Sequence, residues 1–556
     1  MKKTLSLLVM VALLLSLFVF TASAEQPTTL TIGALSSLPN IYLKNPVIQK
    51  ICKEMNITLE LIQYDTDTFN LLMTGGLADI TMASADYASA LVNNKIAKNI
   101  YPYLDDLAPN VKGEAYSAPL TFLQELSGWD EDELYILPMS TGMVSKGGYA
   151  QPERGYIIRW DYYKEIGCPE IKNDDDFMQA LIDMQANHPL TDAGNPTYAI
   201  GVERGLGNMG GYRASFLSSQ LSPWVFGSYL YRSNFVDNTL HDCYTELDVS
   251  TYWTDVEFYH KLNTEGLFDP DSFTMTYDDF IAKVKDGAYM GLYYFYNDLY
   301  AESLKTDPDT LAGYVVIPSE GSVSFCNETV RILGNYPAWY IIIPEESANY
   351  ETAMKFLNYL FDPDVVRDFF SGIKGEDWDY DENGNPVLYD SAFEKLADGS
   401  LYPDTMWVPY NANSMAYDGQ PYDLFNSETY RSKSLNKLQQ DMCEYYGMDF
   451  PTQRHQELVE AGMAIDLSKN LDMTIYASVD TMPLDIKRIL DSCNDILSRA
   501  MPKLIMAESD EEYESIVAET LQLIEEADEA TAWDWASEQW NTAKEKVDSA
   551  MSKINK

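Results

Sequence analysis

Basic residues are scarce in this chain of 556 residues. Lys and Arg together number 38, against 86 Asp and Glu, which gives a formal net charge of −48 at pH 7. So acidic a surface repels the phosphates of nucleic acids and the head groups of anionic lipids. We therefore expect neither as a partner. Hydrophobic residues make up 46% of the chain, which indicates a globular protein rather than a disordered acidic one.

Histidine and cysteine are also rare. The chain has 4 His and 6 Cys, and no C-x-x-C or H-E-x-x-H motif gives them the spacing of a metal site. No G-x-S-x-G motif marks a nucleophilic serine. The sequence thus predicts no catalytic residue, no cofactor and no metal bound by these side chains. The spacing leaves the pairing of disulfides undetermined. A glycosidase stays an alternative function, because it needs only a pair of carboxylates.

Long apolar runs are absent except at the start of the chain. Lys2 and Lys3 precede an apolar run over Leu5–Phe20, and the small residues 21–24 follow it. This is the pattern of a secretory signal peptide, residues 1–24, cleaved after Ala24. A membrane anchor is the alternative, but the run is short for a span. No cysteine lies near the cleavage site to carry a lipid, so we expect an extracytoplasmic protein, secreted or held at the cell surface or in a periplasm.

Tyrosine and tryptophan, by contrast, are abundant. The chain contains 40 Tyr and 10 Trp. An aromatic ring packs its face on apolar C–H groups while its polar tip forms hydrogen bonds, which suits contacts with sugars. Composition alone makes sugar binding only a weak expectation.

The first part of the chain alternates between strand and helix patterns. Strands are expected at Thr29–Leu35, Ile57–Ile62 and around Ile80–Met82, with helices at Asn45–Met55 and after a cap at Asp67. This order predicts a parallel sheet covered by helices. Further on, the pattern predicts a helix at Tyr87–Lys98, an extended segment at Ile100–Asp106 and a buried strand at Tyr135–Pro138.

The stretch Leu71–Tyr87 combines a helix end, a glycine stop, a short strand and a polar end. Gly75 and Gly76 can take the backbone conformation that closes a helix. Ligands of open α/β sheets bind at the carboxyl ends of strands. We therefore expect Ser84, Asp86 and Tyr87 to form one side of a ligand cleft, and Asp79 to be a structural turn or cap residue.

Several motifs, in their order along the chain, carry a resemblance to a known family. They lie at Gly76–Ile80, Asn93–Asp105, Ile158–Pro169, Asn173–Leu181, Phe280–Met290, Trp339–Ile343, Ala353–Pro363 and Ala500–Met506. Asn173 is a good helix N-cap, and Phe177, Leu181 and Met184 give that helix an apolar face. In this order and spacing the motifs resemble the extracellular solute-binding proteins of family 1, most closely the large Gram-positive subgroup that serves ABC importers, mostly for oligosaccharides.

The resemblance implies a two-lobed α/β fold of the periplasmic-binding-protein type II, with a ligand cleft between the lobes and a helical C-terminal region. Lobe 1 would comprise residues 25–156 and 340–402, and lobe 2 residues 157–339 and 403–556. Strands crossing between the lobes are expected near Tyr156–Arg159, Pro337–Ile341 and Tyr402–Trp407.

The resemblance also implies a function. The chain would capture a carbohydrate, as a monomer, by hinge closure and deliver it to the transmembrane subunits of an ABC permease, without catalysis. A peptide or amino-acid ligand of the same fold is the alternative, and a secreted glycoside hydrolase is a further one.

Candidate ligand-binding residues are those expected just past strand ends, together with aromatic side chains suited to stacking. They are Ser36, Ser37, Asn40, Ser84, Asp86, Tyr87 and Ser140 on the first lobe, Glu203, Arg204, Tyr294, Tyr296 and Asn297 on the second, and Trp224, Trp339 and Trp407 as stacking platforms. Core or rim packing is the alternative for each Trp, and solvated surface acids for Asp86 and Glu203.

A weak calcium-loop candidate follows at Asp379, Asp381 and Asn383. These residues, with Gly384 next and Asp390 in twelfth place, resemble an EF-hand loop. The pair Asn383-Gly384 is also a strong turn signal, and we favour a β-hairpin. Some relatives bind calcium in the second lobe, but the matching residues 187–195 hold few carboxylates, which counts against a site there.

Overall fold

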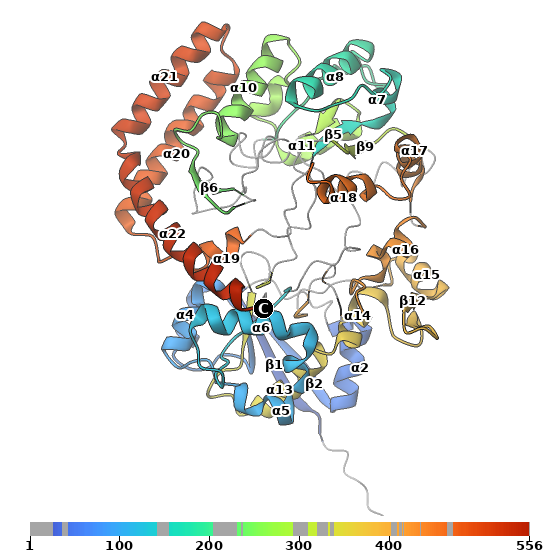
Figure 1. The fold of residues 1–556 in the computed structure, drawn as a ribbon, viewed down its shortest axis with the longest axis vertical. Helices are drawn as coiled ribbons and strands as arrows, with labels where there is room; N and C mark the ends of the chain where they lie inside the picture. The colour runs from blue at the N-terminus through green and yellow to red at the C-terminus, as the bar shows by residue number, and fades with distance from the viewer. Residues whose placement is uncertain are drawn as a thin grey trace, which may run out of the picture.

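The computed structural model describes residues 26–35, 43–141, 155–203, 231–234, 237–292, 310–319, 332–333, 339–401, 408–410, 414, 416, 418–433, 435–463 and 471–554. Figure 1 shows these residues gathered into two lobes, one above the other. Among them, no helix combines the length and the hydropathy needed to cross a membrane. The apolar segment over residues 5–20 lies outside the described residues.

The first lobe contains a sheet of strand order β2-β1-β3-β10-β4. Its strands are β1 (Thr28–Ala34), β2 (Ile57–Gln63), β3 (Ile80–Ser84), β4 (Leu137–Pro138) and β10 (Trp339–Ile342). β1 runs parallel to β2 and β3, which confirms the predicted parallel arrangement. β10 runs antiparallel to both β3 and β4, so β4 points the same way as β3.

Helices pack against the sheet in this lobe. They are α2 (Pro46–Met55), α3 (Thr66–Leu72), α4 (Ala85–Asn93), α5 (Leu104–Leu107), α6 (Glu114–Ser127), α13 (Tyr350–Leu360) and α14 (Pro363–Ser371). The cap of α3 is Asp65, which accepts a hydrogen bond from the Thr68 N–H at 2.7 Å. Asp67 lies in the first turn instead, so the predicted cap was two residues too late.

Two further local predictions in the first lobe were wrong. The helix expected at 87–98 begins at Ala85 and ends at Asn93. The segment expected to be extended at 100–106 forms a 3-10 turn at Tyr101–Tyr103 followed by α5. Ile100 and Leu104 are both buried, and this spacing of four residues fits a helical turn. Pro102 stands at the start of that turn, where its missing N–H costs nothing.

The second lobe is built on a smaller sheet of order β8-β5-β9. Its strands are β5 (Tyr156–Arg159), β8 (Gly291–Leu292) and β9 (Tyr314–Ile317), and β5 is antiparallel to both neighbours. α7 (Trp160–Glu165), α8 (Asp174–Asn187), α10 (Thr251–Thr264) and α11 (Tyr277–Lys285) surround it. Asn173 caps α8 through the Asp176 N–H, as predicted, and the apolar face of α8 is buried.

Crossings between the lobes were expected near Tyr156–Arg159 and Pro337–Ile341. β5 lies within the second sheet and β10 within the first. The segments that lead into these strands, residues 142–154 and 334–338, lie outside the described residues, so these crossings stay a prediction. The third expected crossing, Tyr402–Trp407, lies outside the described residues.

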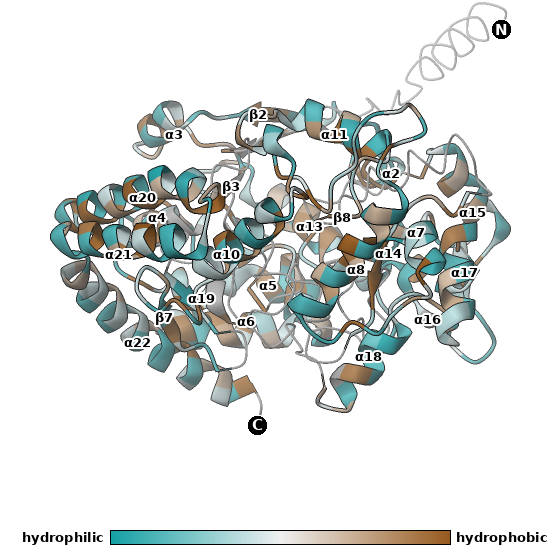
Figure 2. Ribbon diagram, turned by 90° about the horizontal axis from the view of Figure 1, so that it is seen from above, coloured by the Kyte–Doolittle hydropathy of each residue, from teal (hydrophilic) through white to brown (hydrophobic). Residues whose placement is uncertain are grey.

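Long helices dominate the C-terminal region. After α17 (Lys437–Tyr446), α18 (Gln453–Glu460) and α19 (Asp472–Tyr476) come α20 (Leu484–Ile505), α21 (Asp510–Glu526) and α22 (Glu529–Ile554). α20 and α21 lie side by side at one end of the molecule in Figure 2, and α20 packs on α10 of the second lobe. Ser509 caps α21 through the Glu512 N–H, as the sequence pattern predicted.

The last helix connects the two lobes. α22 packs against α20 and α19 and, at its other end, against α6 of the first lobe (Figure 1). Trp540, in the middle of α22, is fully buried and donates from its ring N–H to the Asn238 carbonyl at 2.8 Å. Lys553 near the end of the helix lies 3.5 Å from Glu125 of α6. The predicted assignment of residues 403–556 to lobe 2 did not anticipate this contact.

The described residues between 408 and 431 also make first-lobe contacts. The Thr141 N–H, at the end of β4, donates to the Pro409 carbonyl at 2.7 Å, and the ring of Tyr410 meets that of Tyr116 edge to face. A small satellite core with the hairpin strands β11 (Trp378–Tyr380) and β12 (Pro386–Leu388) and with α15 (Asp390–Asp398) adjoins them. The lobe boundaries stay a prediction, and these contacts favour a boundary just before α17.

A buried carboxyl lies where α22 begins. Glu529 is 4% exposed, accepts a hydrogen bond from the Tyr231 hydroxyl and lies beside Asp242 of β7 (Leu240–Asp242). Burial, and then the charge of Asp242, raises the pKa of Glu529 to about 7. A carboxyl with a raised pKa binds its proton more tightly in the folded state, so stability falls as the pH rises from about 4.5 toward 7.

Replacing Glu529 by Gln should remove the loss of stability that the parent shows as the pH rises. We expect E529Q to gain about 1–3 kcal/mol in unfolding free energy relative to the parent between pH 5 and pH 8. Unfolding midpoints in guanidinium at both pH values measure this difference. An equal effect of E529Q at the two pH values would contradict the assignment of the proton to this pair.

Candidate functional site

The first sheet brings the carboxyl ends of β1, β3 and β4 to one edge. The predicted site residue Ser84 ends β3 at this edge, and Ser140 follows β4. β10 begins at the same edge, and its first residue, Trp339, is the cross-strand partner of Ser84. The structure therefore brings Ser84 and Trp339 together, as expected for one wall of a cleft. Of Trp339, only the backbone is described.

α4 starts directly after β3, with Ser84 as its N-cap residue. Its first N–H groups thus lie at the sheet edge, where the positive end of the helix dipole favours acceptor oxygens. Asp86 lies in this first turn, and its side chain is outside the description. Tyr87 is half-buried, and its ring packs edge to face on Phe69 with the ring centroids 4.9 Å apart. Tyr87 therefore contributes at least to packing.

Ser140 adopts a left-handed backbone conformation with a φ of 53°. Its N–H donates to the Val408 carbonyl at 3.2 Å, and the Ser414 hydroxyl donates to the Thr141 carbonyl at 2.7 Å. Val408, Pro409 and Ser414 are thus joined to the residues that follow β4. The sequence pattern gave no signal for this pairing, because the partners are some 270 residues apart in the chain.

The second lobe presents a corresponding edge. β9 and the segment 198–203 run parallel to β8, so their carboxyl ends meet at one side. Glu203, a predicted site residue, ends the segment and is 2% exposed. Ser319 follows β9 and donates its hydroxyl proton to the Ile171 carbonyl at 2.6 Å.

Most of the other predicted contacts fall outside the described residues. These are Ser36, Ser37, Asn40, Arg204, Trp224, Tyr294, Tyr296, Asn297 and Trp407. The proposed opposition of Ser84–Tyr87 and Tyr294–Asn297 across the cleft therefore stays a prediction.

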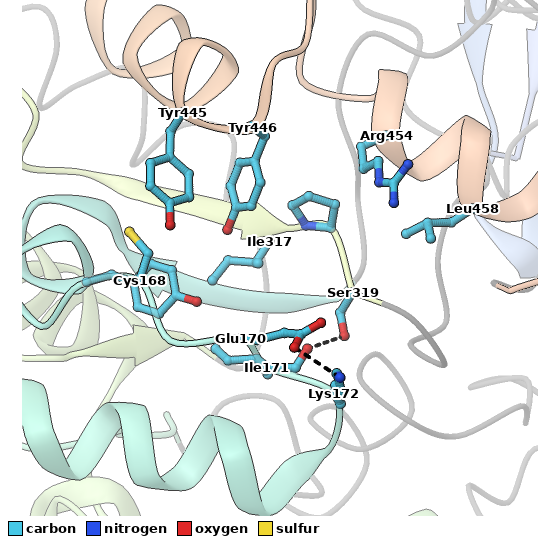
Figure 3. A pocket seen from close by; sticks show the side chains of 12 residues that line it. Cys168, Glu170, Ile171, Lys172, Ile317, Ser319, Tyr445, Tyr446, Arg454 and Leu458 are labelled. Carbon is cyan, nitrogen blue, oxygen red and sulfur yellow. Dashed lines mark hydrogen bonds and ion pairs between the residues drawn. The ribbon is translucent and has the colours of Figure 1, made fainter.

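A pocket that the sequence did not indicate lies beside β9 in the second lobe (Figure 3). Its volume is about 380 Å³, within the usual range for small-molecule sites of roughly 300–1,000 Å³. Its lining comes from the end of α7 and the following loop, the end of β9, α17 and α18. The residues are Tyr163, Cys168, Glu170, Ile171, Lys172, Ile317, Pro318, Ser319, Tyr445, Tyr446, Arg454 and Leu458.

The polar groups of this pocket are neutral or paired. Burial raises the pKa of Tyr163, Tyr446 and Cys168, so the phenols and the thiol keep their protons at neutral pH. Lys172 pairs with Glu170 at 3.0 Å. Such a lining can donate and accept hydrogen bonds, but it offers no thiolate nucleophile.

The calcium-loop candidate forms a hairpin, which confirms the favoured alternative. β11 and β12 pair antiparallel, and Gly384 in the turn has a φ of 82°. The Asp381 carboxylate accepts bonds from the Asn383 and Asn385 N–H groups at 2.8 Å each, so it is used by the turn itself. A helix, α15, begins at Asp390, which the sequence pattern did not indicate.

Residues 187–195 were the other calcium position considered. Here the Asp286 carboxylate accepts hydrogen bonds from Thr191 and Asn195, both at 2.9 Å, so protein groups close the loop. Within the described ranges, no cluster of His, Cys, Asp and Glu has the arrangement of a metal site. The cysteines of the same ranges, Cys52, Cys168, Cys243, Cys443 and Cys493, are free thiols.

Solved structures of solute-binding proteins resemble this chain over nearly its whole length. An HMO binding ABC-transporter associated protein from Bifidobacterium longum infantis is 16% identical, with a TM-score of 0.56. FusA of S. pneumoniae, solved with kestose, is 15% identical with a TM-score of 0.56, and the N-glycan transport protein NgtS of Streptococcus pneumoniae is 10% identical with a TM-score of 0.54. Each likeness covers 93% of this chain and 99% of the other.

The chain has the solute-binding-protein fold. The predicted two-lobed α/β architecture is thereby confirmed, and it agrees with the resemblance found in the sequence motifs. No family model and no curated protein sequence gives a significant match. Within the solute-binding-protein fold described here, the strand edges and the β9 pocket are the candidate ligand contacts.

Proposed function

We propose that this protein is the extracytoplasmic solute-binding protein of an ABC importer and that its ligand is an oligosaccharide. The observation that carries the proposal is the likeness, over 93% of the chain, to solute-binding proteins whose descriptions name oligosaccharide ligands. The strand edge with Ser84 and Trp339 on the first lobe, and the tyrosine-lined pocket on the second, support it.

The proposed mechanism is a hinge equilibrium. A sugar that contacts both lobes binds the closed form more tightly than the open form and so shifts the population toward closure. The closed form is then presented to the transmembrane subunits of the permease. The protein would act as a monomer, break no bond and work after removal of residues 1–24.

Because a bound ligand stabilises the folded state, thermal unfolding tests the proposal. A ligand present at about 100 times its Kd adds about 2.7 kcal/mol to the free energy of unfolding. We expect a raised midpoint with members of a panel of oligosaccharides and no shift with di- and tripeptides. Shifts with peptides alone would favour the alternative ligand class. Turnover of a chromogenic glycoside would favour the hydrolase.

A further inference from the structure

Tyr445 is a large aromatic side chain that stands exposed yet held in place. Half of its surface, 50%, is accessible at the end of α17. Its ring meets that of Trp160 at 5.7 Å and 74°, and that of Tyr446 at 4.9 Å and 88°. Its hydroxyl lies near the Cys168 thiol. These contacts hold the ring in place, while half of the residue's surface stays accessible.

The helix that carries Tyr445 is itself fixed. Asp441, one turn earlier in α17, accepts a hydrogen bond from the Trp160 ring N–H at 2.7 Å and pairs with Lys164 at 2.7 Å. The aromatic platform is therefore preorganised before any ligand arrives, which lowers the entropy lost on binding.

The pocket beside Tyr445 combines apolar and polar surface in the manner that a sugar ring requires. Ile317, Pro318 and Leu458 offer apolar contact, while the hydroxyl of Ser319 and the side chain of Arg454 lie at the far end (Figure 3). That end lies just past the last residue of β9, on the same side of the second sheet as the end of the segment that carries Glu203. A ligand between the lobes could thus extend into it.

We propose that the β9 pocket is a subsite for one ring of a neutral oligosaccharide, stacked on Tyr445. This inference rests on the proposed function and deepens it by naming the ligand class and one of its contacts. The charges of the pocket and of the whole protein favour a neutral sugar. The two cations of the pocket each have an acidic neighbour, Glu170 at 3.0 Å from Lys172 and Glu457 at 3.0 Å from Arg454. Because the net charge of the chain is −48, the protein repels an acidic sugar and leaves the carboxylates of that sugar without a compensating positive charge.

Calorimetric titration of a ladder of neutral oligosaccharides, from disaccharide to hexasaccharide, tests the subsite. We expect Y445A to weaken binding of the longer ligands about tenfold, which corresponds to 1.4 kcal/mol, and to leave the shortest ligand that binds unaffected. Y445F keeps the ring and should bind like the parent. Y389A, at the exposed tyrosine just before α15, is the matched control and should change nothing.

Thiol labelling gives a second readout that needs no variant. Cys168 lines the pocket, whereas Cys52, a thiol of similar half-buried character in α2, does not. A saturating hexasaccharide that binds should slow methanethiosulfonate labelling at Cys168 and leave labelling at Cys52 unchanged, as followed by peptide mass mapping.

The outcomes distinguish a failure of the proposed subsite from a failure of the proposed function. If the parent binds the ladder but Y445A binds every member equally well and Cys168 stays unprotected, the subsite is wrong while the proposed function holds. If the parent binds no oligosaccharide at all, the proposed function fails. Tighter binding of a carboxylated sugar than of its neutral counterpart would overturn the choice of a neutral ligand.

Discussion

Replacing Asp418 by Ala is expected to lower the free energy of unfolding by about 3–5 kcal/mol, because the change leaves a buried charge without its partner. That charge is Arg367 of α14, which is 1% exposed. Its two terminal nitrogens donate to the two carboxylate oxygens of Asp418 at 2.7 Å and 3.0 Å. The guanidinium also lies over the Trp378 ring, 5.2 Å from its centroid, and donates to the Tyr380 hydroxyl at 3.1 Å.

Guanidinium unfolding followed by circular dichroism measures this effect. The matched control is D491A, because Asp491 pairs with Lys487 at 2.8 Å on the exposed surface of α20. An exposed pair of this kind contributes no more than about 1 kcal/mol. Equal losses in D418A and D491A would show that the buried pair does not hold residues 408–431 to the first lobe.

Replacing Asp79 by Ala is expected to cost about 2–3 kcal/mol, since several donors lose one shared acceptor. The carboxylate accepts bonds from the N–H and hydroxyl of Thr31, from the Ser347 hydroxyl at 2.8 Å and from Asn349 at 3.2 Å. These donors come from β1 and from the turn before α13. Asp79 therefore joins distant segments next to β3, which supports its interpretation as a structural residue.

The effect of Asp79 should depend on pH. Burial alone would raise its pKa, but the hydrogen bonds, led by that of the Thr31 N–H, outweigh burial and hold the pKa below its usual value. A carboxyl with a lowered pKa stabilises the protein above the unfolded value of about 3.9, and this stability is lost as the pH falls further. We expect D79A and the parent to converge in stability toward pH 2.

The control for D79A is D65A, which removes the exposed N-cap of α3 and should cost about 1 kcal/mol. Thermal unfolding at pH 7 and at stepwise lower pH compares the two variants. A D79A effect that stays constant down to pH 2 would contradict the role assigned to the ionised carboxylate.

Local patterns were enough to predict the order of the first elements of lobe 1. The β1-α2-β2-α3-β3 order follows from short apolar runs separated by cap and turn residues. Gly75 and Gly76, expected to close a helix, have φ values of 141° and 105°. Asn45, which caps α2, and Asn173, which caps α8, also act through neighbours two or three residues away. Such signals are contained in a few consecutive residues, so a sequence reveals them.

The features that were missed depend on residues far apart in the chain. The pairing of Thr141 with Pro409 and the contact of α22 with α6 both join distant segments. The β9 pocket likewise joins residues 163–172, 317–319 and 445–458. A pair of tyrosines before a helix-ending glycine, Tyr445-Tyr446-Gly447, was the available hint, but the Trp160 that supports Tyr445 could not be assigned to it from spacing alone.

Calorimetric titration of the mature protein with oligosaccharides, followed by chromatography of the recovered sugar, tests the central claim most directly. The account predicts saturable binding of at least one neutral oligosaccharide, with the sugar recovered intact. Binding of none of them, or recovery of shortened products, would contradict the proposal that this protein captures oligosaccharides without catalysis.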